Sequence, residues 1–528
     1  MRDSCARLSY SLGRRLVNGP AGRLARPDKL LAELDLTTGP FELGRAGGPP
    51  FAAAAPSPAA RPLVYTLEMA FIGSLPPLPG GMPPGARTRR LAGGFACLLG
   101  VVATGCSSSS PSAPATASPI GSSSPLCKGA GRCVSIAANA PETAIAGAFA
   151  GVKDGDTLAF APGTYEFDNQ LALGAANGVT ILGAGQGKTI LDFHGQKQGD
   201  DALYAQSVRD LTFQDFTVQD SPGNASKALG VTGLTFRSVE VKWTSKDSKS
   251  HGAYGLYPVQ SENVLIEQCA ISGASDSGIY VGQSQQIVVR NNEAFANVAG
   301  IEIENSFFAD VYGNDSHDNT AGILVFDLPG LTQEGGHDIR VHQNVIKSND
   351  TENFAAAGDI VSLVPGGTGF FVMANHDVEV FDNMIIGNKD SGAGIISYAL
   401  AQMAFTDASY YEWPSKIYLH DNTFMTNGTM PDLAADIGLV LATGTSVYPG
   451  GNVPDVLWDG IADPALPAGP NPMQICIHEP TASGVCNMHF DQLDTNAPDE
   501  SKLVVCDPAP FDCTLPPLAP VTFPGLKP

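Results

Sequence analysis

The sequence predicts an all-β fold built as a solenoid, in which short strands stack from one coil to the next. Glycines recur at intervals of 23, 22 and 22 residues from Gly255 to Gly322, and a fixed period of this size indicates a repeat architecture. Within the repeats, apolar residues alternate with polar ones, which is typical of strands. The 59 Gly and 40 Pro, with 8% aromatic residues, favour turns over helices.

The chain after residue 105 is strongly acidic. Its 47 Asp and Glu outnumber its 18 Lys and Arg, so this part has a formal charge of −29. Such a body repels polyphosphate, and we therefore expect no nucleic-acid partner. An anionic polysaccharide would need a bridging cation or a local basic patch.

The first 126 residues divide into three segments. Residues 1–81 are rich in Pro, Ala, Gly and Arg without periodicity. We interpret them as a disordered or misassigned leader, with the true start at Met82. Residues 82–105 carry three Arg, a short apolar run and small residues, which is the pattern of a secretory signal. Residues 106–126 form a Ser/Pro-rich tether.

The end of the signal indicates where the chain is anchored. Ala103-Thr-Gly-Cys106 resembles the lipobox of bacterial lipoproteins, in which the cysteine is lipidated and becomes the mature N-terminus. The resemblance implies that residues 82–105 are a lipoprotein signal peptide and that Cys106 carries the lipid. The protein would then be exported and anchored in the bacterial cell envelope, at the outer membrane or surface. An ordinary cleaved signal is the alternative.

Six further cysteines are disulfide candidates, because an exported chain meets an oxidising environment. Pairing between sequence neighbours is the simplest arrangement, although six cysteines allow about 15 pairings. The neighbouring pairs are Cys127–Cys133, Cys476–Cys486 and Cys506–Cys513. Cys269 lies inside the repeat, and we expect it to be a buried free thiol.

Residues 127–430 are predicted to form the solenoid, with about nine coils. A short helix over 142–152 precedes the coils and is expected to cap the open sheet edge, which would otherwise pair with other chains. Residues 431–528 lose the repeat and are interpreted as an irregular C-terminal cap and tail. Equivalent strands are expected around Val179, Leu211, Leu234, Val264, Ile287, Asp310, Ile339, Val378 and Ile417.

The 22-residue period also locates insertions and a column of asparagines. The asparagines are Asn292, Asn314, Asn344, Asn383 and Asn422. We expect them to stack at one corner because Asn tolerates left-handed turn conformations and can bond its own turn backbone. Departures from the period place extra loops around residues 328–336, 350–367 and 402–415. Insertions in solenoids fall in loops, often on one binding face.

Several segments identify a family resemblance. The predicted helix, the GDTLAFAPGTYEF segment at 155–167 and the 22-residue coils resemble right-handed parallel β-helix proteins of the pectate-lyase-like type. More narrowly, GAYGLYPVQSENV, GASDSGIYVGQS and VAGIEIENS are similar to a family of bacterial exported parallel β-helix repeat proteins. This resemblance implies the fold over about residues 130–430 and no assigned activity. It also implies a c-type cytochrome as a partner in the cell envelope.

A carboxylate pair is the candidate functional site. If Ile301 and Ile303 point into the coil, Glu302 and Glu304 point out together, about 6.5–7 Å apart. The same outward columns hold Tyr257 and Tyr280 on one side and a set of apolar residues on the other. Such an apolar surface should not face water, so we expect the loops at 350–367 and 402–415 to cover it. The apolar set is Leu324, Phe326, Phe371, Met373, Ile396 and Tyr398.

Three interpretations of this pair stay open. Glu302 and Glu304 could act as acid and base on a glycosidic bond. They could bind Ca²⁺ together with Asp276 or Asp327, because Ca²⁺ prefers oxygen ligands. They could also be solvated strand residues, with the tyrosines only packing. In the first two cases Tyr257, Tyr280 and Asp327 would contact substrate.

A second candidate is weaker. Ser316-His317-Asp318 is predicted to lie at a turn, where such side chains usually cap the backbone. His317-Asp318 is partly similar to the Asp-Pro-His-Asp motif of mannuronan epimerases, but the Asp-Pro is absent.

Two functions follow from these features. The favoured one is a cell-envelope lipoprotein whose β-helix binds a glycan or a protein partner. The alternative is a polysaccharide lyase or C5-epimerase acting on a uronate-containing polymer, with Ca²⁺ as its cofactor.

Overall fold

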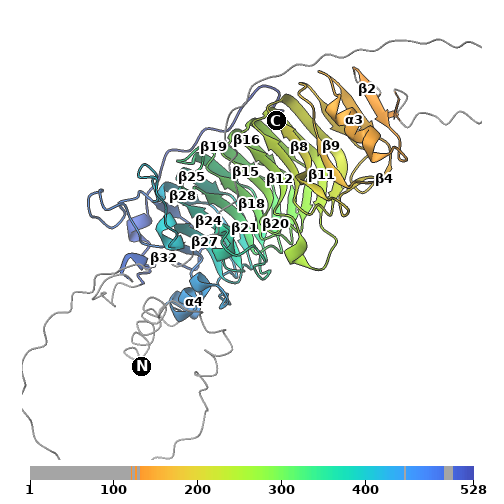
Figure 1. Cartoon of the computed structure of the whole chain (residues 1–528). Helices are drawn as coiled ribbons and strands as arrows, with labels where there is room; N and C mark the ends of the chain where they lie inside the picture. The colour runs from red at the N-terminus through yellow and green to blue at the C-terminus, as the bar shows by residue number, and fades with distance from the viewer. Residues whose placement is uncertain (1–119, 122–124, 128–130, 445–447, 493–503, 528) are drawn as a thin grey trace, which may run out of the picture. The chain divides into compact units, whose positions relative to one another are not determined.

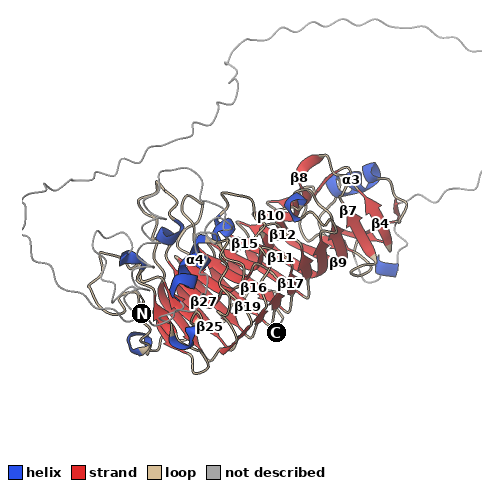
Figure 2. Ribbon diagram, turned by 90° about the horizontal axis from the view of Figure 1, so that it is seen from below, coloured by secondary structure: helices blue, strands red, loops and turns tan. Residues whose placement is uncertain are grey.

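The computed structural model describes residues 120–121, 125–127, 131–444, 448–492 and 504–527. These residues form a parallel β-helix, as predicted (Figures 1 and 2). The predicted leader, the signal and Cys106 lie outside the described residues. Among the described residues no helix is long and apolar enough to cross a membrane.

One face of the β-helix is an eleven-stranded sheet, in which strands of successive coils pair in parallel. Nine of its strands, β5 to β27, belong to the predicted solenoid, which confirms the expected number of coils. Its strands are β5 (Asn169–Ala172), β8 (Gln198–Gln206), β10 (Asn224–Leu229), β12 (Tyr254–Val259), β15 (Ser277–Gly282), β18 (Ala299–Glu304), β21 (Ala321–Phe326), β24 (Thr368–Met373), β27 (Ser391–Ile396), β30 (Val456–Trp458) and β32 (Val485–Asn487).

The other two faces belong to a second, 21-stranded sheet, with a long and a short strand in most coils. All nine strands predicted from the apolar alternation lie in it. Its strands are β1 (Ile120–Gly121), β2 (Cys133–Ile136), β3 (Thr157–Phe160), β4 (Gly163–Glu166), β6 (Thr180–Leu182), β7 (Thr189–Asp192), β9 (Arg209–Gln219), β11 (Thr232–Lys242), β13 (Glu262–Glu267), β14 (Ala270–Ser272), β16 (Gln285–Arg290), β17 (Glu293–Phe295), β19 (Phe307–Tyr312), β20 (Asp315–His317), β22 (His337–His342), β23 (Val345–Lys347), β25 (His376–Phe381), β26 (Met384–Ile386), β28 (Ser415–His420), β29 (Thr423–Met425) and β31 (Cys476–His478).

The helices are short and lie outside the coils. The predicted N-terminal helix is α3 (Glu142–Ala150), which packs Ile145 and Phe149 into the core at the first coils (Figure 1). The other α-helix among the described residues is α4 (Asp436–Thr443). The 3₁₀ helices are η1 (Pro125–Cys127), η2 (Ser248–Ser250), η3 (Ile360–Leu363), η4 (Tyr398–Ala401), η6 (Pro449–Gly451), η7 (Phe490–Gln492) and η9 (Ala509–Phe511).

The coil interior is a continuous apolar core that extends from Ile136 to Phe511. Inward side chains stack on equivalent residues one coil away, as the rings of Phe213 and Phe236 do at 5.0 Å. Burying one such side chain stabilises the fold by roughly 1.5–3 kcal/mol. The repeated glycine has a steric reason, because a Cβ at Gly300 would lie 2.1 Å from Ser316 Oγ.

Asparagines form two ladders along the β-helix. In the predicted ladder each side-chain amide before the last donates to the next Oδ1, as Asn292 does to Asn314 at 2.9 Å, and Asn422 at the end donates to Glu479. The expected left-handed conformation was wrong for the asparagines, because it belongs to the preceding residue, such as Asn291 with φ 55°. The expected bond to the turn's own backbone is found at Asn383, which donates to the Phe381 carbonyl at 3.0 Å. The second ladder was not predicted, and it comprises Asn297, Asn319, Asn349, Asn388 and Asn427.

The C-terminal part continues the β-helix beyond residue 430. Strands β30, β31 and β32 extend both sheets. After Cys513 the chain runs back along the 21-stranded sheet, so that the C-terminus lies near β16 (Figure 1). There the Leu518 and Val521 N–H groups donate to the carboxylates of Glu379 and Asp310 at 3.0 and 2.9 Å.

The six candidate cysteines form three disulfides, and two pairings differ from the simplest arrangement. Cys127 pairs with Cys133. The expected Cys476–Cys486 and Cys506–Cys513 pairs are wrong: the bonds are Cys476–Cys513 and Cys486–Cys506. Sequence proximity fails here because Cys476 and Cys486 lie on different sheets, in β31 and β32. Cys269 is a buried free thiol, as predicted.

Candidate functional site

The carboxylate pair lies on β18, in the middle of the eleven-stranded sheet. Ile301 and Ile303 fill the coil interior, so Glu302 and Glu304 project from the outer face. Glu302 lies between Tyr280 of β15 and Leu324 of β21. The two glutamates therefore lie at the boundary between tyrosines and apolar residues on the outer face of the sheet. The 22-residue period predicted this position.

Both glutamates are covered, since Glu302 is 1% and Glu304 6% exposed. The interpretation as solvated strand residues is therefore wrong. The predicted loop cover is confirmed, because loops at 348–367 and 397–414 pack on the outer face in a second apolar cluster. From the sheet this cluster takes Leu324, Phe326, Phe371 and Met373, and from the loops Val361, Val364, Tyr398 and Tyr410.

Ser277 joins two carboxyl groups of the site. Its hydroxyl lies 3.0 Å from Asp276 Oδ1 and also hydrogen-bonds to Glu302 Oε2. A hydroxyl carries a single proton and can donate to only one of them. The other carboxyl group must itself be protonated to pair with the serine oxygen. The Asp276–Ser277–Glu302 contact thus holds a proton, and Glu302 Oε1 has no partner.

The pKa values of these carboxyl groups agree with this geometry. Burial raises the pKa of Asp276 to about 7, although hydrogen bonds from Ser277 and Tyr254 lower it. Burial also raises the pKa of Glu304 to about 7, against the hydrogen bond from Tyr280. The pKa of Glu302 is raised well above its ordinary value by burial and then by the charges of Asp276 and Glu304.

Three tyrosines pack beside the carboxylates. The rings of Tyr254 and Tyr257 lie 4.5 Å apart, and each lies within 5.0 Å of the Tyr280 ring. The Tyr280 hydroxyl donates to Glu304 Oε1. Tyr254 was missed by the sequence analysis, although it precedes Gly255 just as Ser277 precedes Gly278. Burial raises the pKa of Tyr257 to about 12, so this phenol stays neutral.

The outer face is more open on the coils before β15. Tyr204, Lys227 and Tyr257 occupy one column on β8, β10 and β12, and all three are half-buried. Lys227 Nζ lies 4.8 Å from the centre of the Tyr257 ring. We call these three residues the open strip. Tyr204 and Lys227 were missed because the 30-residue step from Lys227 to Tyr257 breaks the period.

Asp327 follows strand β21, and its charge contributes to the raised pKa of Glu304. Its carboxylate accepts the N–H groups of Gly335 and Gly336 at 3.1 and 2.9 Å. Its carbonyl oxygen accepts the Tyr410 hydroxyl. Asp327 is fully buried and holds the loop at 327–336 in place, so the expected substrate contact is not available in this conformation.

The described part of the chain holds no group of three or more Asp, Glu, His or Cys side chains arranged to bind a metal ion. The expected calcium ligands Asp276, Glu302 and Glu304 are instead hydrogen-bonded to Ser277 and Tyr280. The geometry gives this calcium site no support, and Ca²⁺ binding remains a prediction for experiment.

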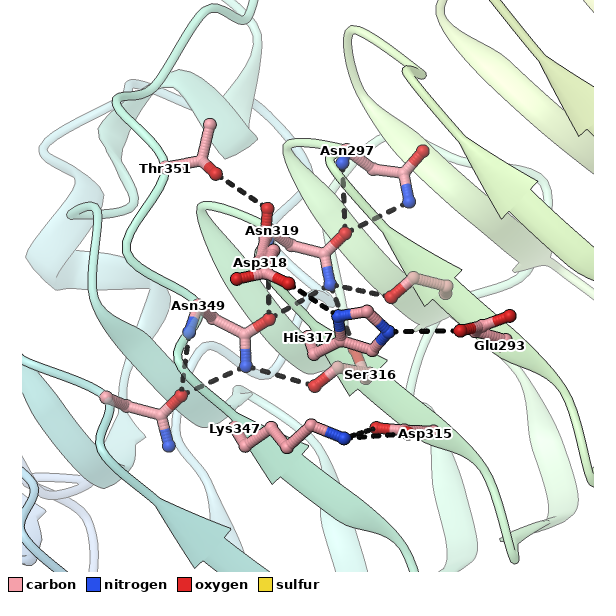
Figure 3. Close-up of polar contacts among 12 residues, drawn as sticks. Glu293, Asn297, Asp315, Ser316, His317, Asp318, Asn319, Lys347, Asn349 and Thr351 are labelled. Atoms are coloured by element: carbon pink, nitrogen blue, oxygen red, sulfur yellow. Dashed lines mark hydrogen bonds and ion pairs between the residues drawn. The ribbon is translucent and has the colours of Figure 1, made fainter.

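His317 is part of a separate polar group on the 21-stranded sheet (Figure 3). Its ring nitrogens lie 2.7 Å from Asp318 and 3.3 Å from Glu293, and its ring stacks on Phe295. The predicted turn is wrong, because Ser316 and His317 lie in strand β20. β20 belongs to the 21-stranded sheet and the carboxylate cluster to the eleven-stranded sheet, so His317 does not join the candidate site.

Comparison with known proteins agrees with this architecture. The family described as "Right handed beta helix region" matches residues 177–330. A comparison with curated proteins finds no match. Among solved structures, the chain is similar to the A-module of a mannuronan C-5 epimerase from Azotobacter vinelandii, with 17% identity, coverage of 55% of this chain and 84% of that one, and a TM-score of 0.36.

Two further solved structures are similar to the chain. An exopolygalacturonase from Thermotoga maritima has 12% identity, coverage of 56% of this chain and 80% of that one, and a TM-score of 0.36. An endopolygalacturonase from Stereum purpureum has 16% identity, coverage of 55% and 96%, and a TM-score of 0.32. These likenesses concern the fold alone. The family match supports the predicted right-handed β-helix over residues 177–330.

Proposed function

We propose that this protein binds a polysaccharide without cleaving it, on the open strip of the eleven-stranded sheet. The observation that carries the proposal is the contrast along one column: Tyr204, Lys227 and Tyr257 are half-buried, whereas Glu302 is 1% exposed. Neighbouring coils are about 4.8 Å apart, so the strip offers a contact at each coil. A chain lying along the coil axis would meet these contacts in turn.

The strip has the chemistry for a sugar chain. Each tyrosine combines an apolar ring face with a polar hydroxyl, which suits a ligand with both kinds of surface. The Lys227 ammonium is a compact positive charge that can pair with a uronate carboxylate. In a chain with a strong acidic excess, Lys227 provides the local basic group that an anionic polymer needs.

Binding is favoured over catalysis because the loops at 348–367 and 397–414 cover the carboxylate cluster. An acid or base must come within about 2.6–3.2 Å of the proton that it transfers. Glu302 and Glu304 lie beneath the loops and are hydrogen-bonded to Ser277 and Tyr280. They cannot reach a glycosidic bond unless the cover opens.

A lyase or C5-epimerase is the second candidate. One observation favours it: Asp276 and Glu304 have pKa values of about 7, close to the pH at which a general acid or base works best. They also lie next to Tyr257, at the end of the open strip. This function requires the loops at 348–367 and 397–414 to move away.

Calorimetric titration of the full chain with oligogalacturonate and oligoalginate, with and without Ca²⁺, tests the proposal. We expect binding of a uronate oligomer, and a roughly tenfold loss of affinity in Lys227→Ala and in Tyr257→Ala. Lys416→Ala and Tyr418→Ala on β28 of the other sheet are matched controls and should bind as the wild type does. Equal binding by all four variants contradicts the proposed site.

The same incubations distinguish the two functions. An unsaturated product that absorbs in the ultraviolet, and that disappears in Glu302→Gln, would replace the binding function with a lyase. Inverted uronate configuration detected by proton NMR would indicate an epimerase. Absence of any glycan binding, together with co-purification of a c-type cytochrome, would favour a protein-docking role.

We also propose export and anchoring through Cys106. The three disulfides support an oxidising compartment outside the cytosol. Mass spectrometry of the N-terminus of the native protein should find a lipid-modified cysteine at position 106. An unmodified N-terminus at another residue would favour an ordinary cleaved signal, and a peptide from before Met82 would contradict the expected start.

A further inference from the structure

A polar pocket lies at the edge of the eleven-stranded sheet, where β12 and β15 end. Its volume is about 310 Å³, at the lower end of the range for ligand pockets. Tyr257 of the open strip and Gln260 of the pocket are three residues apart in the chain. Its lining residues include Gln260, Glu262, Gln283, Gln285, Thr332 and Gln333.

The loop at 327–336 builds one wall of this pocket. It reaches back over earlier coils, and the Gln260 side-chain amide donates to Thr332 Oγ1 at 3.1 Å. Thr332 Oγ1 donates to Gln283 Oε1 at 2.7 Å. The Gln333 side chain donates to the carbonyl of Asn305 at 2.7 Å, which fixes the loop on the sheet. The insertion thus closes a side that a regular coil would leave open.

Two of the lining glutamines occupy unusual backbone positions. Gln260 and Gln283 have φ of 51° and 50°, the left-handed region that favours glycine. The preceding coil has Gly230 at the equivalent turn, with φ of 64°. Other coils have Ser207 and Asn305 at this turn, with φ of 54° and 46°, so the position does not require glycine. The Gln260 and Gln283 side chains both contact Thr332 of the loop, which places their amide groups at the pocket.

The lining chemistry indicates a neutral ligand. An amide side chain offers both donors and an acceptor, which matches adjacent sugar hydroxyl groups. The lining residues include no Lys, Arg or His, and Glu262 would repel a uronate. We propose that this pocket binds one neutral sugar ring of a polysaccharide that continues onto the open strip. This inference rests on the proposed function and names the sugar class at one position.

A second pocket provides a matched comparison. It has a volume of about 400 Å³ on the 21-stranded sheet and is also lined by amides, among them Gln268 and Asn291. Glu293 and Asp315 line it as well, so its surface is acidic. Gln268 is exposed and left-handed with φ of 57°, as Gln260 is. The same substitution at Gln268 therefore controls for backbone effects.

Calorimetric titration of the full chain with cellohexaose, mannohexaose and maltohexaose as neutral probes, and oligogalacturonate as the acidic probe, tests the inference. We expect one neutral hexaose to bind, and Gln260→Asn and Gln283→Asn to weaken it about tenfold. Asparagine tolerates the left-handed conformation and shortens the side chain, so the variants should fold. Gln268→Asn should bind as the wild type does.

The outcomes separate this inference from the proposed function. If no neutral hexaose binds, or if Gln260→Asn and Gln283→Asn bind it as the wild type does, the sugar pocket is wrong. In that case, oligogalacturonate binding that depends on Lys227 still supports the open strip. If no probe binds at all, both are wrong. Thermal unfolding of each variant checks that a loss of affinity is not a loss of fold.

Discussion

The hydroxyl group of Ser277 on β15 hydrogen-bonds to the carboxyl group of Glu302 on the next coil, and Asp276 lies on its other side. This contact needs a proton that two ionised carboxylates would not supply. The site that the sequence presents as two exposed glutamates is therefore a buried, partly protonated cluster. Its behaviour should depend on pH in a direction that the pKa shifts determine.

The free energy of unfolding should decrease as the pH rises from about 4 to about 7. Asp276 and Glu304 have native pKa values of about 7, above their ordinary values of 3.8 and 4.5. The native state therefore binds more protons than the unfolded state in this window, and stability is lost as the pH rises through it. The expected change is on the order of 3 kcal/mol for each of the two groups. Urea unfolding between pH 4 and 8 measures it.

The double variant Asp276→Asn/Glu304→Gln should reduce this slope without abolishing it. Burial also raises the pKa values of Asp327, Asp390, Asp459 and Glu479, which supply the remainder. Glu267 on the other sheet is the control: burial raises its pKa, but hydrogen bonds from Arg237 and Arg290 outweigh this and lower it. Its contribution is present above its ordinary pKa and is lost as the pH falls. Glu267→Gln should therefore leave the slope between pH 5 and 7 unchanged. An unchanged slope in the double variant would mean that the cluster is not its source.

Ser277→Ala should destabilise the protein by about 1–3 kcal/mol, because it leaves buried carboxyl groups without their shared partner. Ser362→Ala is a suitable control, since the Ser362 hydroxyl bonds only to the nearby Asp359 carbonyl. We expect that control to lie within about 0.5 kcal/mol of the wild type. Urea unfolding at pH 6 compares the two, and equal stability would show that the Ser277 contact contributes little.

Asn314→Ala should destabilise the protein, because Asn314 is a buried member of the asparagine ladder. Asn314 donates to Val289 and Asn344 and accepts from Asn292, and it is 1% exposed. Its removal leaves buried groups unpaired, at about 1–3 kcal/mol each. Asn169→Ala, at an exposed asparagine, should cost less than about 0.5 kcal/mol. Thermal unfolding of both variants is the measurement, and a small effect at Asn314 would contradict a structural role for the ladder.

Peptide mapping without reduction should find Cys476 linked to Cys513 and Cys486 linked to Cys506. In a Cys476→Ser/Cys513→Ser variant the tail after residue 513 loses its covalent anchor. The Val521 amide, which donates to Asp310, should then exchange its hydrogen faster. Cys127→Ser/Cys133→Ser at the other end is the control. Linked Cys476–Cys486 peptides would contradict the assigned pairing.

Much of the fold could be predicted because the repeat constrains each coil locally. Equivalent residues of neighbouring coils recur about 22 residues apart, as the glycines and the stacked asparagines do. The same period predicts that Ile301 and Ile303 point inward. The same 22-residue period located the three inserted loops and the apolar surface that two of them cover. The second asparagine ladder, which includes Asn297 and Asn319, has the same spacing and could have been found in the same way.

The disulfide pairing and the open strip could not be predicted in this way. Cys476 and Cys513 meet only because the chain leaves one sheet and returns to it. Lys227 lies beside Tyr257 on the neighbouring strand, although an insertion after β11 lengthens the sequence between them to 30 residues. The disulfide pairing and the open strip both depend on the course of irregular segments, which the repeat does not predict.

The sequence by itself determined the coils, their register and the direction in which Glu302 and Glu304 point, because side-chain alternation and the 22-residue period are local properties. Only the tertiary structure decided that the two glutamates are buried. Their exposure depends on loops 348–367 and 397–414 folding across several coils, and burial in turn changes their protonation. The physical reason is that solvent access, unlike side-chain direction, is set by segments distant in the chain.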